Sequence, residues 1–100
     1  MIRRAARVDA NHGEIVAALR SIGVNVVDMS GSGNGLPDLM CLWRSQIYLL
    51  EIKDGSKPPS ARRLTADQVK FHAGALDSGV KVHVVETIDQ ALAIFGAMVA

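Results

Sequence analysis

The sequence predicts an α/β fold in which helices flank a mixed sheet of four strands. Two apolar segments, 36–43 and 46–53, follow one another across a short polar break and have the length of paired strands. A helical pattern at 65–78 leads into the strand-like segment 80–86, and a strand, helix, strand passage forms a right-handed parallel crossover. An antiparallel hairpin joined to a parallel crossover gives a mixed sheet covered by helices.

The elements at the two ends of the chain complete the order αβββαβα. Ile15 and Leu19 recur at helical spacing within residues 9–22, and Gly23 stands where a helix commonly ends. The β-branched run VNVVDM that follows is short and typical of a strand. Residues 89–98 form the last expected helix, and their apolar side chains hint at association with a second copy of the chain.

The composition fits one small domain, which we expect to span residues 1–100. Hydrophobic residues make up 49% of the chain and the formal net charge is +1, so overall charge does not mark a nucleic-acid-binding protein. Cys41 lies in an apolar segment, which favours a buried free thiol and excludes a disulfide framework. No apolar run approaches the roughly 18 residues of a membrane span, and no signal-peptide pattern is present. We therefore expect a cytoplasmic protein without a membrane partner.

Charged residues stand at one end of the two central strands. If Arg44 and Ser45 form a two-residue turn, the pairing of the hairpin places Asp38 opposite Glu51. Their Cβ atoms would lie about 4.5–5.5 Å apart, where like charges repel unless one acid is protonated or a cation lies between them. Lys53 falls on the same face as Glu51 because side chains alternate along a strand. A shift of the register by one residue would separate the two acids.

Two carboxylates at the rim of a sheet suit a hard divalent cation. Oxygen ligands favour Mg²⁺ or Mn²⁺, which commonly bridge protein carboxylates to a substrate phosphate. Lys53 would then orient a water molecule and offset negative charge on that phosphate. The spacing alone fits an alternative without a metal equally well: Glu51 and Lys53 would form an ion pair at the surface, and Asp38 would be a turn residue.

Four short segments of the sequence together carry a family resemblance. The proline-aspartate of GLPD (35–38) and the segment EIK (51–53) resemble the signature of the PD-(D/E)XK nuclease superfamily. With Leu64-Thr65 and Gln68 added, the pattern is similar to the VRR-NUC family, especially its compact stand-alone members from bacterial viruses. The resemblance extends over about residues 14–86 and implies a restriction-endonuclease-like core. The valine-arginine-arginine stretch behind the family name is not present as such.

The resemblance implies a metal-dependent deoxyribonuclease that uses Mg²⁺ or Mn²⁺. It implies that Lys53 is catalytic and that Asp38, Glu51 and the Ile52 carbonyl hold the metal. Branched or Holliday-junction DNA would be the substrate of a homodimer acting in the cytoplasm of a bacterium or a phage-infected cell. A catalytically inactive DNA-binding or assembly module on the same fold is the alternative. The remaining residues that the resemblance carries over are Glu14, as an acid turned toward the metal, and Gln68, as the motif glutamine in the catalytic group.

Local patterns offer other roles for these two residues. Thr65 and Gln68 have the spacing of a helix capping box, which would by itself explain the glutamine. Glu14 lies beside the apolar stripe of the first helix and would equally fit a solvated acid. His12, His72 and His83 show no metal-ligand spacing, and we expect no catalytic role for them.

Two loops could contact DNA. SGSGNG at 30–35 lacks the lysine of a phosphate-binding P-loop, but its small residues would let a nucleic-acid backbone approach. The loop at 54–63 is basic and could bind phosphates, as could arginines near the start of the chain. The candidate DNA-binding residues are Ser32, Asn34, Lys57, Arg62 and Arg63, with Arg3, Arg4 and Arg7 as weaker candidates.

Overall fold

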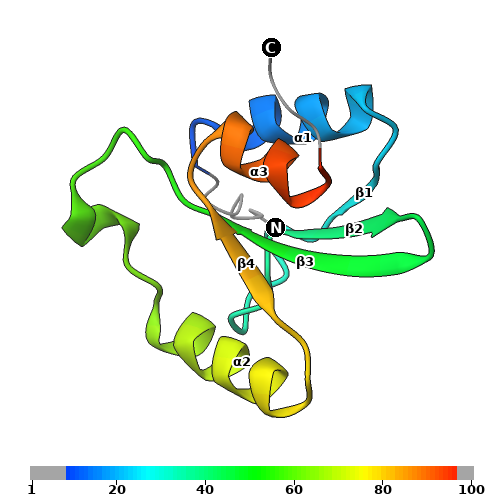
Figure 1. Cartoon of the computed structure of the whole chain (residues 1–100). Helices are drawn as coiled ribbons and strands as arrows, with labels where there is room; N and C mark the ends of the chain where they lie inside the picture. The colour runs from blue at the N-terminus through cyan, green and yellow to red at the C-terminus, as the bar shows by residue number, and fades with distance from the viewer. Residues whose placement is uncertain (1–8, 97–100) are drawn as a thin grey trace, which may run out of the picture.

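The computed structural model describes residues 9–96, which form a mixed sheet with helices on both faces (Figure 1). This confirms the predicted fold class and element order. Within these residues, no helix combines the length and apolar character needed to cross a membrane. In chain order the elements are α1 (His12–Ser21), β1 (Asn25–Asp28), β2 (Leu39–Trp43), β3 (Gln46–Ile52), the 3₁₀ turn η1 (Pro59–Arg62), α2 (Ala66–Asp77), β4 (Val82–Val85) and α3 (Ile88–Ile94).

The four strands lie side by side in the order β1-β2-β3-β4. The first three are antiparallel, and β4 joins β3 in parallel after the crossover through α2. The predicted hairpin register is confirmed, since Met40 pairs with Leu49 and Leu42 with Ile47. Arg44 and Ser45 form the turn with φ angles of 46° and 67°. Two positive φ angles are what a two-residue type I′ turn requires, although neither residue is glycine.

Helices α1 and α3 cover one face of the sheet and form the hydrophobic core with it (Figure 1). Ala91, Leu92 and Phe95 of α3 are buried in this core, and Ile94 is partly buried against it. The described part of the last helix therefore does not offer the spare apolar surface that its sequence suggested, because those side chains are used inside the fold. Met98 lies outside the described residues.

The opposite face of the sheet is only partly covered. Helix α2 lies on that side, next to β4, and has no buried residue (Figure 1). Its side chains Val69 and Leu76 are 53% and 67% exposed, and Ile47 of β3 is 66% exposed. The apolar surface that the fold leaves uncovered thus gathers around α2 and not around α3.

The start of α1 is tied to the far side of the sheet. Asn11 precedes the helix, and its side-chain amide donates hydrogen bonds to the carbonyls of Lys53 (3.1 Å) and Glu86 (2.9 Å). The apolar periodicity predicted a helix from residue 9, but the helix begins at His12. These bonds hold the segment before α1 against the end of β3.

Candidate active site

The two acids of the hairpin meet beyond the last pair of β2 and β3. Asp38 Oδ2 accepts a hydrogen bond of 2.7 Å from the backbone N–H of Ile52, and its carbonyl accepts one of 2.7 Å from Met29. Asp38 is thereby fixed to both neighbouring strands. Glu51 lies beside it and is 1% exposed. The register predicted from the sequence thus brings the two carboxyl groups together.

Glu51 is held in an environment that favours its neutral form. Burial raises the pKa of Glu51 to about 9, and the hydrogen bond and negative charge of Asp38 raise it as well. Asp9 acts in the same direction, whereas the positive charge of Lys53 lowers the pKa. A carboxyl group beside a second carboxylate keeps its proton more readily, and this holds for Glu51 next to Asp38 when no cation is bound. A divalent cation between them would remove the need for that proton.

Gln68 connects Lys53 to Glu51. Its Oε1 accepts hydrogen bonds from Lys53 Nζ and from the backbone N–H of Thr65, both 2.9 Å long. Its Nε2 donates to Glu51 Oε2 at 3.2 Å. The Thr65 hydroxyl in turn accepts from the Gln68 backbone, which completes the predicted capping box. The two roles foreseen for Gln68 therefore coexist, and the start of α2 is anchored in the site.

A glycine allows α2 to come this close. Gly35 has a φ of +75°, and a Cβ added there would overlap the backbone carbonyl of Asp67 in the first turn of α2. Any larger residue would push the helix away from the loop at 30–35 and carry Gln68 away from Glu51. The glycine of GLPD thus has a packing role that the sequence did not reveal.

His72 also reaches this site, although no role was predicted for it. It lies one helical turn after Gln68, and its Nε2 is 3.6 Å from Glu51 Oε1. Both atoms are buried and lack a hydrogen-bond partner. Burial lowers the pKa of His72, and the positive charge of Lys53 lowers it further. The spacing of four residues from Gln68 was the available signal, because it places both side chains on one face of a helix.

The two acids, Lys53 and Gln68 line an open cavity of about 570 Å³ at the ends of β2 and β3, whereas His72 and Gly35 do not line it. Arg62 is turned away and instead forms an ion pair of 2.9 Å with Glu86. Ser32 is exposed and lines none of the cavities described for this face, whereas Asn34 lines two neighbouring ones. The predicted site residues that the structure brings together here are Asp38, Glu51, Ile52, Lys53, Lys57, Arg63 and Gln68.

The acid contributed by the first helical region is Asp9 and not Glu14. Glu14 is exposed and does not line the cavity, because the buried stripe of α1 that faces the sheet is built from other positions. Asp9 lines the cavity, and its Oδ1 is 3.6 Å from Lys57 Nζ. The helix predicted from the sequence included residue 9, so Asp9 was not recognised as an acid that precedes the helix.

The donor set consists of oxygen atoms, which suit hard cations better than soft ones. Among residues 9–96, no group of three histidine, cysteine or acidic side chains is arranged to hold a metal ion. The site offers instead the two paired carboxylates, Asp9 near them, and backbone oxygens. Mg²⁺ typically binds through one or two carboxylates and completes its shell with water and substrate oxygens.

The remaining singled-out residues are structural where the structure describes them. Cys41 is buried and free, as predicted, and burial raises the pKa of its thiol to about 11. Trp43 packs edge-on against Phe95, at 6.1 Å between ring centroids. His12 is buried, with Nε2 2.9 Å from the carboxylate of Asp28. The arginines at 3, 4 and 7 lie outside the described residues.

Comparison with known proteins identifies the fold. The sequence matches no family model and no curated protein. Among solved structures, a VRR_NUC domain superposes with a TM-score of 0.64 at 24% sequence identity. The match covers 88% of this chain and 97% of that one. The chain therefore has the fold of a VRR_NUC domain, and the fold implied by the sequence resemblance is confirmed.

Proposed function

We propose that the chain is a member of the VRR-NUC family and hydrolyses DNA phosphodiester bonds with the help of Mg²⁺ or Mn²⁺. The observation that carries the proposal is the buried Glu51 next to Asp38, with Lys53 linked to Glu51 through Gln68. Burial of an acid beside a second acid costs folding free energy at neutral pH, so a fold without a use for the pair would gain by losing it. The shared fold with a VRR_NUC domain supports a nuclease activity for this arrangement.

The residues present fit a divalent cation. Glu51 Oε1 is buried without a hydrogen-bond partner, which is the state expected of an oxygen reserved for another ligand. Asp38 and Glu51 would hold the ion, with the Ile52 carbonyl and Asp9 available beside them. When bound, such an ion supplies Lewis-acid polarisation of the phosphate and activation of water.

The other side chains of the cavity have separate tasks. Lys53 Nζ, held at 2.9 Å by Gln68 Oε1, orients the attacking water and offsets the charge that develops on the phosphate. Lys57 and Arg63 line the outer part of the cavity and bind the phosphates on either side of the scissile bond. Recognition then depends on the DNA backbone and shape more than on base sequence.

We extend the proposal to branched DNA and to a homodimer in the bacterial or phage-infected cytoplasm. A symmetric dimer presents two active sites to two strands of a junction. The exposed apolar side chains Val69, Leu76 and Val80, on and after α2, provide surface for such an interface.

The test is cleavage of a labelled panel of duplex, single-stranded, flap and four-way-junction DNA with Mg²⁺ or Mn²⁺. Lys53→Ala should abolish cleavage without unfolding the protein, and the matched control Lys81→Ala, at an exposed lysine outside the cavity, should cut like the wild type. A folded wild-type protein that cuts no member of the panel would refute the nuclease proposal. DNA binding that persists in EDTA and in Lys53→Ala would then favour the inactive module.

A further inference from the structure

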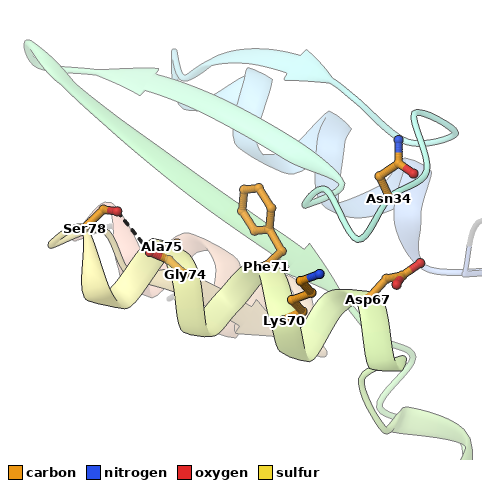
Figure 2. A pocket seen from close by; sticks show the side chains of 7 residues that line it. All are labelled: Asn34, Asp67, Lys70, Phe71, Gly74, Ala75 and Ser78. Carbon is orange, nitrogen blue, oxygen red and sulfur yellow. Dashed lines mark hydrogen bonds between the residues drawn. The ribbon is translucent and has the colours of Figure 1, made fainter.

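A second groove runs along α2 and continues into the candidate active site. It has a volume of about 600 Å³ and lies between α2 and the loop at 30–35 (Figure 2). A smaller cavity of about 330 Å³ connects the two regions. That cavity shares Asn34 and Asp67 with the groove, and Asp38 and Gln68 with the active site. A DNA strand bound at the acids can therefore extend along the loop into the groove.

A glycine inside the helix keeps the groove open. Gly74 lies within α2, where glycine destabilises a helix relative to alanine. Packing does not require it, because a Cβ added at Gly74 would meet no atom within 4 Å. Its φ is not positive, unlike that of Gly35 or Gly79, so the backbone does not require it either. Glycine at position 74 thus destabilises the helix, and neither packing nor backbone conformation within the described residues explains why it is there.

The walls of the groove offer three kinds of contact that one nucleotide needs. The ring of Phe71 rises from α2 toward the sheet and is half-buried, which leaves a surface for a base to stack on (Figure 2). Lys70 is beside it and can pair with a phosphate. Asn34 and Asp67 lie at the end nearest the active site, where an amide and a carboxylate can bind the polar edge of a base.

We propose that this groove binds an unpaired nucleotide of the substrate, next to the phosphate that is cut. The inference rests on the proposed nuclease function and names its substrate class as DNA with a single-stranded extension or an unpaired base. Only an unpaired base can turn its face onto Phe71, because bases within a duplex are stacked on each other. The volume of the groove lies within the usual range of about 300–1,000 Å³ for small-ligand pockets and fits a ligand of nucleotide size.

The decisive variant fills the groove without disturbing the fold. Gly74→Met places an unbranched side chain in the open space beside Phe71 and improves helix propensity. The matched control is Ala73→Met, the same side chain at the neighbouring exposed position, which does not line the groove. Binding is measured by fluorescence anisotropy with Ca²⁺ in place of Mg²⁺, for a blunt duplex and for the same duplex with a single-stranded extension. 2-Aminopurine at successive positions of the extension reports stacking through quenching of its fluorescence.

Gly74→Met should weaken binding of the extended duplex about tenfold, the effect of losing one stacked base, and should leave the blunt duplex unaffected. It should also abolish the 2-aminopurine quenching, whereas Ala73→Met should keep both. Equal affinities of wild type and Gly74→Met for the extended duplex would overturn the inference. So would a loss of dimers in Gly74→Met on sedimentation with DNA binding intact, because the groove would then be a contact between copies. Cleavage of the flap or four-way-junction DNA by the wild type, together with equal binding of the extended duplex by Gly74→Met, would mean that only the subsite fails; no cleavage of any panel member by the wild type would mean that the nuclease proposal fails.

Discussion

Replacing Glu51 by glutamine should stabilise the metal-free protein at neutral and alkaline pH. The neutral amide reproduces the protonated acid: its NH₂ group can donate to the Asp38 carboxylate. Its oxygen can accept the bond from Gln68 Nε2 that now reaches Glu51 Oε2 at 3.2 Å. The substitution removes the cost of ionising a buried acid beside another acid and keeps the packing.

The size of the effect follows from proton linkage. The pKa of Glu51 rises from its ordinary 4.5 to about 9 in the folded protein, so the folded state binds this proton more tightly than the unfolded chain. The resulting stabilisation is complete below pH 4.5 and is lost progressively as the pH rises toward 9. Each pH unit in that window corresponds to about 1.4 kcal/mol. At pH 7.5, Glu51→Gln should therefore gain up to about 4 kcal/mol in free energy of unfolding.

Urea unfolding followed by circular dichroism, in EDTA and at several pH values, measures this difference. Glu14→Gln is the matched control, because it removes an exposed acid and should change the free energy of unfolding by less than about 0.5 kcal/mol at every pH. Added Mg²⁺ should stabilise the wild type and not Glu51→Gln. A difference between Glu51→Gln and wild type that does not vary with pH would refute the reasoning, since Glu51 would then be ionised in both states.

Three further predictions test how the site is built. Gly35→Ala should lower the free energy of unfolding by about 2–4 kcal/mol, because of its positive φ and its overlap with Asp67; wild-type stability in urea would contradict this contact. Gln68→Ala should slow cleavage about 100-fold. Thr65→Ala should lower the free energy of unfolding by about 1 kcal/mol and leave the cleavage rate nearly unchanged. Equal losses of cleavage rate in the two variants would mean that Gln68 acts only as part of the helix cap of α2. Asp9→Asn should weaken Mn²⁺ binding about tenfold, as measured by electron paramagnetic resonance, whereas Glu14→Gln should bind Mn²⁺ like the wild type. Weaker binding in Glu14→Gln and unchanged binding in Asp9→Asn would instead identify Glu14 as the third acid of the site.

Local rules determined the hairpin and the capping box. The pairing of Met40 with Leu49 follows from a two-residue turn and the period of two along a strand, and that register alone sets Asp38 beside Glu51. The cap of α2 follows from the spacing of Thr65 and Gln68. Such features depend on residues close in sequence, so a single chain contains the information needed to predict them.

Contacts between distant segments were decided only by the tertiary structure. Asn11 bonds to Lys53 and Glu86, which starts α1 late and leaves Asp9 facing the acids instead of Glu14. His72 reaches Glu51 because the crossover sets α2 over the end of β3. No periodicity encodes how two elements are placed across a sheet, since that placement results from the packing of the whole chain. Residues close in sequence therefore specify the paired acids, whereas the packing of distant segments specifies which side chains surround them.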